Sequence, residues 1–436
     1  MRSFGDRFWT SAEGEMIRFR RRRFESLRVD LPLDPPTKNS RRGTKKKAKA
    51  ALDAAFEDDI LARHARELTP WPKPRAAIAL DIYLAGGSRN SPRVDNICKW
   101  LLDELAGHVY ADDRQVKLLF ASASKPPRAS WRFFANEDLG DLDDVSKEVY
   151  RDRTSVADEP TSTAKKPSSK LYITAQTRAS VLADLRAVSN LEDRWDPFEE
   201  EGRGYFDVFE DDLRRDSITD YRSIFDSGSD RDREQWRRLT NELDHHDQNQ
   251  QQHLVDLIFS SLLTDMPVDR FELWNRVLGR IGAAPYIFNL GVLPKHGGRD
   301  AFKANLRQTL EARRDAWPSL FPMRARSGVS MILFEEPSSG KDLDNLVQTV
   351  LPDVLTVLRP QEEDLRGWVA DEPDPHDGEP TIPFIEVAAI PAHLTDMPAG
   401  SVIFGLSSAD RYDSWWHKAA EHLKETLEEE ELRGWW

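Results

Sequence analysis

A pattern of acidic residues occurs twice in this chain. The first copy contains Asp95, Asn96, Lys99, Asp112 and Asp113. The second copy begins with Asp342 and contains, at the corresponding positions, Asp344, Asn345, Gln348, Glu362 and Glu363. The acidic pair follows the first shared aspartate by 17 positions in the first copy and by 18 in the second, where Pro352 is the additional residue. Because the repeat preserves acids more faithfully than apolar residues, it indicates a site. The chain must therefore adopt a fold in which two segments with the same acidic pattern can form similar local structures.

The spacing within the first copy predicts a helix between two strands. Residues four positions apart share one helix face, so polar residues gather on one side and apolar residues on the other. The polar residues are Asp95, Lys99 and Asp103, and the apolar residues are Ile97, Leu101 and Leu105. Asn96 can cap the start of this helix. Alternating apolar residues predict strands over 77–84 and 115–120, so the acids should converge at one edge of a sheet.

Such a cluster suits Mg²⁺ or Mn²⁺, which bind oxygen ligands and retain several waters. The candidate metal ligands are Asp95, Asp112, Asp113, Asp342, Asp344, Glu362 and Glu363. The candidate catalytic residues are Asp95, Lys99, Asp112, Asp113, Asp342 and Asp344. Lys99 would stabilise negative charge at a phosphate while the carboxylates hold the metal. The alternative is that these acids only cap helices and occupy solvated turns.

The same residues resemble a known family. Asp-Asn-x-x-Lys at 95–99, followed by Asp-Asp-x-Gln at 112–115 between two expected strands, is similar to the RusA family of Holliday junction endonucleases. Segment 31–39 is also similar to the Pro-Pro-Ser-x-Asn segment common in that family. The resemblance covers roughly 28–123, and a weaker second match covers roughly 287–391. It implies a Mg²⁺-dependent endonuclease of a kind that usually acts as a symmetric homodimer.

Each copy departs from the family pattern at different positions. The first copy has Arg93 where the leading aspartate belongs. A guanidinium is always protonated, so it competes with a metal ion or replaces it as a phosphate clamp. The second copy keeps Asp342 but has Gln348 where the lysine belongs, and glutamates replace its aspartate pair. Gln348 is the milder loss, because the lysine contributes charge while the carboxylates hold the metal.

We therefore predict an α+β, or mixed α/β, fold in which two RusA-like modules, each a mixed sheet with helices, are joined by a largely helical middle segment. The expected divisions are a basic N-terminal arm (1–27), module one (28–136), a flexible linker (137–170), the helical middle segment (171–281), module two (282–410) and an acidic C-terminal helix (411–436). The linker is predicted from its Ser, Thr, Pro and Lys content. The helical segment is predicted from its apolar spacing.

The overall charge does not favour nucleic acid, but its distribution does. The chain has 62 Lys and Arg against 76 Asp and Glu, a net charge of −14. However, a basic block lies between Arg18 and Lys49, where it can neutralise phosphates. The candidate nucleic-acid-binding residues are Arg20, Arg21, Arg22, Arg23, Lys38, Arg41, Arg42, Lys45, Lys46, Lys47 and Arg93. The alternative is that this block is a solvated tail or a basic helix start.

The single cysteine, Cys98, excludes an intrachain disulfide and fits a reducing compartment. Met1 is not followed by an apolar signal-peptide core, and no apolar run reaches about 18 residues. We therefore expect a cytoplasmic protein without a membrane partner.

Two hypotheses for function follow. The first is a metal-dependent, structure-selective endonuclease that acts on branched or junction DNA in recombination and repair. The second is a non-catalytic protein that binds branched DNA, or regulates, on a decayed resolvase-like fold. A four-way junction is two-fold symmetric, so the modules are expected to form an intrachain pseudo-dimer, or else the chain forms a homodimer. We also expect the second copy to hold metal more tightly and the first copy mainly to grip phosphate.

Overall fold

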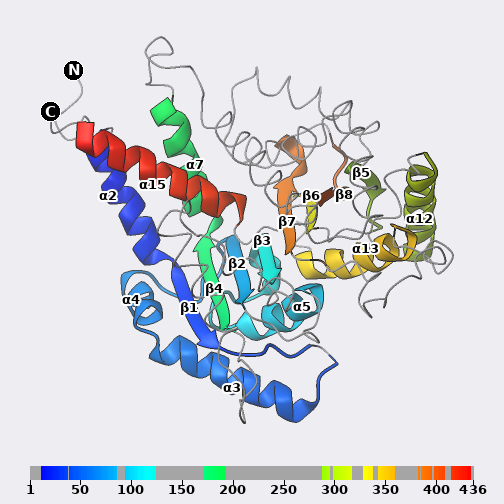
Figure 1. The fold of residues 1–436 in the computed structure, drawn as a ribbon, viewed down its shortest axis with the longest axis horizontal. Helices are drawn as coiled ribbons and strands as arrows, with labels where there is room; N and C mark the ends of the chain where they lie inside the picture. The colour runs from blue at the N-terminus through cyan, green and yellow to red at the C-terminus, as the bar shows by residue number, and fades with distance from the viewer. Residues whose placement is uncertain are drawn as a thin grey trace, which may run out of the picture.

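The computed structural model describes residues 11–37, 39–85, 94–123, 170–192, 287–294, 298–316, 328–336, 342–358, 382, 384–394, 397–407 and 414–433. Within these residues the chain forms one mixed eight-stranded sheet with α-helices on both faces (Figure 1). The general α+β class predicted from the sequence is therefore confirmed. Four of the candidate site residues lie outside the described residues: Lys38, Arg93, Glu362 and Glu363.

The sheet has the same strand arrangement on either side of its centre. The strands are β1 (Leu27–Pro32), β2 (Ile78–Ala85), β3 (Val116–Ala123), β4 (Lys170–Thr177), β5 (Ile287–Val292), β6 (Gly328–Glu335), β7 (Phe384–Pro391) and β8 (Ser401–Ser407). Their order is β1-β4-β2-β3-β7-β6-β8-β5. Outward from the central β3–β7 pair, each half of the sheet has one parallel pair followed by two antiparallel pairs. We call β1 to β4 the first half and β5 to β8 the second half.

The two halves meet at an antiparallel seam between β3 and β7. Leu118 pairs with Ala388, and Ser122 pairs with Phe384. A second contact crosses the seam, because Lys117 Nζ lies 2.8 Å from Glu335 Oε2 at the end of β6. The halves therefore share backbone hydrogen bonds and a charge pair as parts of one continuous sheet.

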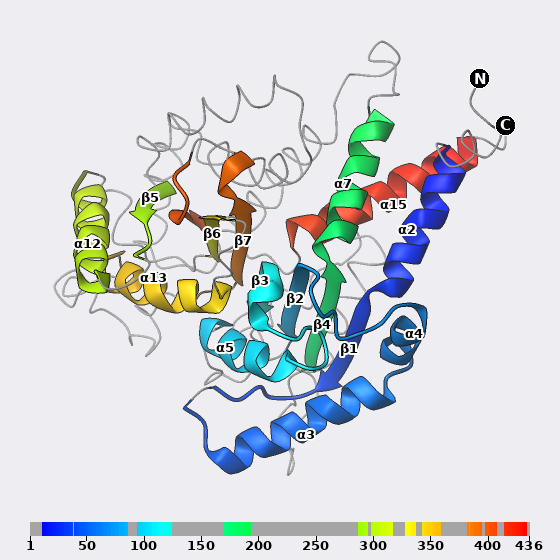
Figure 2. The same cartoon turned by 180° about the vertical axis from the view of Figure 1, so that it is seen from behind.

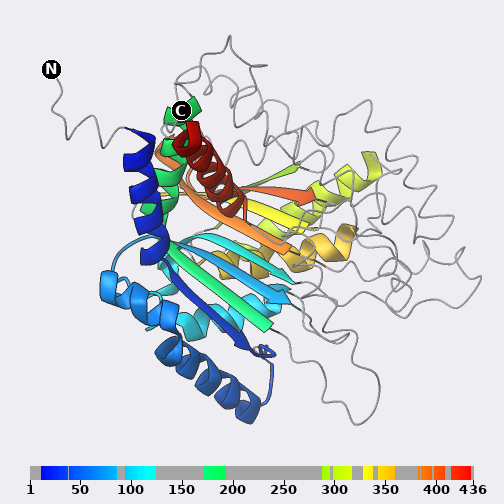
Figure 3. The same cartoon turned by 60° about the vertical axis from the view of Figure 1, so that its left-hand side comes forward.

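Helices cover both faces of the sheet (Figure 2, Figure 3). The helices are α2 (Ala12–Glu25), α3 (Arg42–Asp58), α4 (Ile60–Leu68), α5 (Val94–Leu105), α7 (Arg178–Glu192), α12 (Arg299–Ala316), α13 (Leu343–Leu358) and α15 (Trp415–Arg433). The buried side chains of α3, α4, α5, α12 and α13 belong to one apolar core, and those of α2, α7 and α15 belong to another. These two cores lie on opposite faces of the sheet, since alternate strand residues contribute to each.

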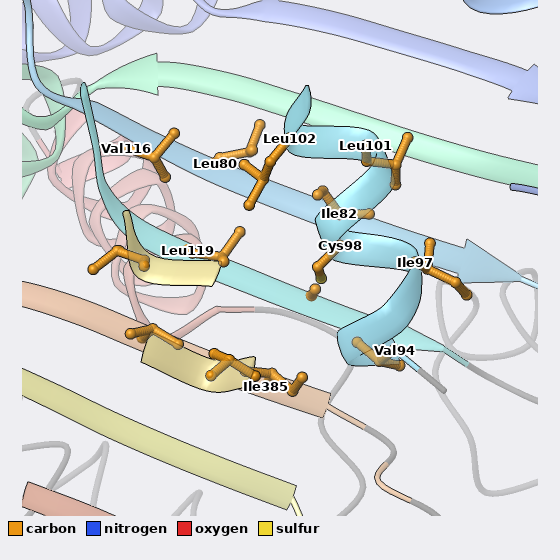
Figure 4. Close-up of a cluster of buried hydrophobic side chains, with 14 of the residues drawn as sticks. Leu80, Ile82, Val94, Ile97, Cys98, Leu101, Leu102, Val116, Leu119 and Ile385 are labelled. Carbon is orange, nitrogen blue, oxygen red and sulfur yellow. The ribbon is translucent and has the colours of Figure 1, made fainter. Parts of the chain in front are cut away.

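The core beneath α5 shows how the apolar spacing of the sequence produces this packing. Figure 4 shows the apolar side of α5 lying over β2 and β3, with Leu80 and Leu119 beneath it. Ile385 of β7 belongs to the same cluster, so the packing under α5 continues across the seam. On the opposite face of the sheet, α15 follows the second half in the chain and contacts β2 of the first half, where Trp416 Nε1 donates to Asp81 Oδ2 at 3.0 Å.

Two details of the predicted secondary structure are wrong. Residues 170–177 form β4 in the sheet and not the start of a helical middle segment, and α7 follows directly. The chain pairs here because Leu171, Ile173 and Ala175 alternate toward one core while β1 and β2 supply hydrogen bonds on both sides. In addition, α5 begins at Val94, so Asn96 lies inside the first turn and does not cap it. The rest of the expected middle segment, 193–281, lies outside the described residues.

The expected C-terminal helix corresponds to α15. Among the described residues, no helix combines the length and the apolar character needed to cross a membrane.

Candidate metal centre

Helices α5 and α13 carry the two acidic starts and contact each other through them. Lys99 Nζ of α5 lies 2.5 Å from Asp344 Oδ2 of α13. One turn away, Gln348 Nε2 of α13 donates to the carbonyl oxygen and to Oδ2 of Asp95 on α5, each at 3.3 Å. The first acid of each helix therefore meets the residue four positions later on the other helix. This pattern requires the two helices to run in opposite directions.

Three carboxylates gather at one end of this helix pair. Asp112, Asp113 and Asp342 each place one oxygen within 4.8 Å of the others. The first two come from the turn between α5 and β3, and the third precedes α13. The cluster therefore combines the acidic pair of the first copy with the leading aspartate of the second. This differs from the expectation that each copy forms a site of its own.

The turn that carries Asp112 and Asp113 is held by the side chain of Gln115. Its Oε1 accepts the backbone N–H groups of Ala111 and Asp112, at 2.9 and 3.0 Å. Its Nε2 donates to the carbonyl oxygens of Lys73 and Ala76, at 2.9 and 3.0 Å. An amide can make all four bonds because it carries both acceptor and donor capacity. The glutamine of the Asp-Asp-x-Gln pattern is thus a positioning residue that fixes the acidic turn against the segment before β2.

Asp342 is positioned by two neighbours. Asn345 Nδ2 donates to its Oδ2 at 2.7 Å, so the asparagine of the second copy holds the leading aspartate in place. Arg114 Nε lies 3.5 Å from Asp342 Oδ1 and 3.9 Å from Asp112 Oδ1. Arg114 was not among the predicted site residues, although a cation directly after the acidic pair was visible in the sequence. It is well exposed, so it can also turn toward an anionic ligand.

The crowded acids change the protonation of the centre. Burial, followed by the charges of Asp342 and Asp344, raises the pKa of Asp113 to about 6, while Lys99 acts in the opposite direction. Like charges disfavour ionisation in this way when no cation neutralises them. Burial acts to lower the pKa of Lys99, but the hydrogen bond to Asp344 and the charges of the neighbouring carboxylates together outweigh burial, so the pKa is raised. Lys99 therefore remains an ammonium beside the carboxylates.

Asp344 carries the strongest sign that the centre accommodates a cation. Its side chain is 2% exposed, and its Oδ1 accepts no hydrogen bond from any described residue. A buried carboxylate oxygen without a donor is expensive, and a bound cation is one way to satisfy it. The charge of Asp344 also acts on Asp113, so this carboxylate lies near the cluster. With carboxylates as the only donors, the group formed by Asp112, Asp113 and Asp342 can hold a metal ion of the oxygen-binding class.

Asp95, which was predicted to be a ligand, lies apart from this group. It is 2% exposed, so it does not belong to a solvated helix face as its spacing suggested. Its charge and that of Asp344 both add to burial in raising the pKa of the Cys98 thiol, which places the two acids near the same side chain. The remaining predicted ligands, Glu362 and Glu363, lie outside the described residues.

The predicted basic surface is divided between the two faces of the sheet. Arg22 Nε lies 2.6 Å from Asp184 Oδ1, and Arg23 pairs with the same buried carboxylate, so these two arginines hold α2 against α7. They are not available to phosphate, contrary to the prediction. Arg20 and Arg21 are exposed on α2, on the face away from the acidic centre. Arg21 pairs with Glu25 of its own helix.

The second part of the basic block lies on the same face as the centre. Arg41 and Arg42 are exposed where α3 begins, and so are Lys46 and Lys47, while Lys45 is partly buried. One turn further, Lys49 Nζ lies 2.7 Å from Glu104 Oε2, and this ion pair ties α3 to α5. Only this half of the predicted block is therefore placed to act together with the acidic centre.

No family model, no curated protein and no solved structure matches this chain.

Proposed function

We propose that this protein is a Mg²⁺- or Mn²⁺-dependent, structure-selective DNA endonuclease built from two RusA-like modules in one chain. The observation that carries the proposal is the convergence of Asp112, Asp113 and Asp342, beside the buried Asp344 and the ammonium of Lys99. Carboxylates with an adjacent cation are the groups that metal-assisted phosphodiester hydrolysis requires. The repeated strand order supports the pseudo-dimer, because it relates the two halves across the β3–β7 seam.

Each side chain has a definite task in this proposal. Asp112, Asp113 and Asp342 hold the metal, while Gln115 and Asn345 fix the acidic turn and Asp342 in place. A bound Mg²⁺ would polarise the phosphate and lower the pKa of a water molecule. Lys99 pairs with Asp344 and adds positive charge beside the position of the phosphate.

DNA binding is assigned to the start of α3. Figure 1 shows α3 running beneath α5, and the Lys49–Glu104 ion pair joins the two helices. Exposed Arg41, Arg42, Lys46 and Lys47 can neutralise phosphates there despite the net charge of −14.

The decisive experiment uses labelled four-way junctions, flaps and linear duplexes. With Mg²⁺ or Mn²⁺ the wild type should nick a branched substrate. With Ca²⁺ it should bind without cutting, because Ca²⁺ has a looser coordination geometry and is a weaker Lewis acid. Asp342→Asn should remove cutting and retain binding. If the wild type binds branched DNA but never cuts it with any of these metals, the protein is a binding or regulatory protein instead.

A matched pair of surface variants tests the DNA path. Lys46→Glu with Lys47→Glu should weaken junction binding and reduce its dependence on salt concentration, since each phosphate contact contributes to that slope. Arg20→Glu with Arg21→Glu changes the same charge on the opposite face and should leave binding nearly unchanged. Equal losses would remove α3 from the proposed interface.

A further inference from the structure

Two unlike contacts occupy equivalent places between α5 and α13. In sequence, Asp95 corresponds to Asp344, and Lys99 corresponds to Gln348. The structure pairs Lys99 with Asp344 and Gln348 with Asp95. Exchanging each residue for its counterpart in the other copy turns one contact into the other, just as it relates the two halves of the sheet. They lie one helix turn apart, about 6 Å along α5. In a symmetric homodimer these two contacts would have the same residues, whereas here one contains a lysine and the other a glutamine.

The acid in one position has the chemistry of a working centre. Asp344 faces an ammonium, has an oxygen without a donor, and lies beside the carboxylate cluster to which Asp112 and Asp113 belong. The residues around Asp344 are the acids that can hold a metal ion, the lysine that supplies positive charge, and the amides that hold the acids in place. Its members come from both copies of the repeat.

The acid in the other position meets a different group across the helices. Asp95 faces the neutral amide of Gln348, which carries no charge to stabilise a phosphate. By sequence, the residue two positions before Asp95 is Arg93, where Asp344 is preceded by Asp342. The two departures from the repeat therefore fall on the same side: Arg93 stands beside Asp95 in sequence, and Gln348 contacts Asp95 across the helices. Each copy departs from the repeated pattern at one of these positions, and both departures affect the acid at the same position, Asp95.

We propose that the described part of the chain forms one working metal centre and that the protein therefore cuts a single strand at each encounter with branched DNA, leaving the opposite strand intact. This inference rests on the proposed nuclease function. In the reaction one water adds its hydroxyl to the phosphorus, the bond from phosphorus to one bridging sugar oxygen breaks, and the proton released from the water passes to that oxygen. A second cut requires the protein to release the DNA and bind again in the opposite orientation.

The wild-type protein tests this directly through metal stoichiometry and product type. Calorimetric titration should give one Mn²⁺ per chain. A supercoiled plasmid that extrudes a cruciform should give nicked circles first, and linear DNA only after rebinding, so excess competitor junction should suppress linear product. Two Mn²⁺ per chain with immediate linearisation would overturn the single-centre inference while leaving the nuclease function intact. No Mn²⁺ binding and no cutting would overturn the nuclease function itself.

A gain-of-function variant sharpens the test. Arg93→Asp with Gln348→Lys restores the leading aspartate and the lysine at the weaker position, so a second Mn²⁺ should bind and linear product should appear in the presence of competitor. Gln348→Met is the control, because it alters the same contact without adding charge, and it should leave nicking as in the wild type. A double variant that folds, as judged by its circular dichroism and Tm, and still binds one Mn²⁺ would contradict the assignment of Asp95 and Gln348 to a lost centre.

Discussion

Helices α5 and α13 begin with the same acidic pattern and bury the same face, but they contribute different chemistry. On the core side, Cys98, Leu101 and Leu102 of α5 correspond to Val347, Val350 and Leu351 of α13, and all six are buried. On the side where the helices meet, one offers a lysine and the other a glutamine. The core tolerates any apolar residue of suitable size, whereas a single neutral amide changes what the acidic side can do.

This difference between the two helices shows that the two copies of a repeat need not each form a complete site or each lose one. Each helix supplies half of each contact, so a substitution in one copy alters the site that includes the acid of the other copy. A chain with two linked halves can lose one centre completely while the other remains whole. A homodimer cannot do so, because every substitution appears in both of its centres.

The largest expected effect separates the two equivalent aspartates. Asp344→Asn should slow nicking on the order of 10² to 10³, by analogy with the removal of a single electrostatic contributor at a catalytic centre. Asp95→Asn, the matched variant in the other helix, should slow nicking by less than about tenfold. Single-turnover rates on a junction measure both. Equal losses would show that the two positions work together, which would break the comparison.

The second effect concerns the glutamines. Gln115→Ala removes the four hydrogen bonds that hold the acidic turn, so Mn²⁺ affinity should fall by about 10-fold to 100-fold, as for other residues that orient metal ligands. Gln348→Ala makes the same change of side chain at the weaker position and should leave the affinity within about twofold. Calorimetry with Mn²⁺ provides the measurement. An unchanged affinity in Gln115→Ala would mean that the turn keeps its shape without this side chain.

The third effect is a gain of stability. The pKa of Asp113 is raised in the folded state to about 6 from an ordinary value of 3.8, so the folded state holds this proton more tightly. Stability of the metal-free protein therefore falls as pH rises from about 4 to about 6, and the loss persists above that range. Asp113→Asn should raise the Tm of the metal-free protein above pH 6, have no effect below pH 4, and abolish the stabilisation by Mn²⁺.

Asp103→Asn is the control for this prediction. Asp103 is an exposed acid on α5, outside the carboxylate cluster, although it lies 3.6 Å from Lys99 Nζ, and its substitution should retain the stabilisation by Mn²⁺. If Asp113→Asn lowers the Tm of the metal-free protein above pH 6, burial and the neighbouring carboxylates do not raise the pKa of Asp113 in the folded state.

The smallest expected effect tests the equivalence of the two core faces. Cys98→Val places in α5 the residue that α13 has at the corresponding position, so the free energy of unfolding should change by less than about 1.5 kcal/mol. In the wild type, burial raises the pKa of the Cys98 thiol well above its usual range, so the native protein should not react with thiol reagents at neutral pH. Rapid labelling in the folded state would mean that α5 opens locally.

Local sequence patterns predicted most of the helices and strands around the centre. Alternation in β2 and the four-residue spacing in α5 follow from contacts that each segment makes with one core. The acidic residues were also found by spacing. However, the strand β4 was not predicted, although Leu171, Ile173 and Ala175 alternate. The helical spacing of the residues after β4 favoured a helical segment that began at 171. A strand that pairs with two distant partners has no local sign of where it belongs.

The pairing of Lys99 with Asp344 could not be predicted from either copy alone. It joins residues far apart in the chain and depends on two helices packing in opposite directions. The prediction that Arg22 and Arg23 bind DNA is wrong for the same reason. The sequence does not reveal that both arginines pair with the buried Asp184. A basic run indicates available charge, but tertiary pairing decides which part of it remains exposed.

The β3–β7 seam also sets an order of events during synthesis. The first half of the sheet can form while the ribosome is still far from β7, and until then β3 is an unprotected edge strand with open N–H and C=O groups. Leu118 and Phe120 lie on that edge strand, and the finished sheet buries both of them. Such edges pair readily with other chains. An unfinished chain should therefore be most vulnerable to pairing with a second unfinished chain along β3, in the place that its own β7 later occupies.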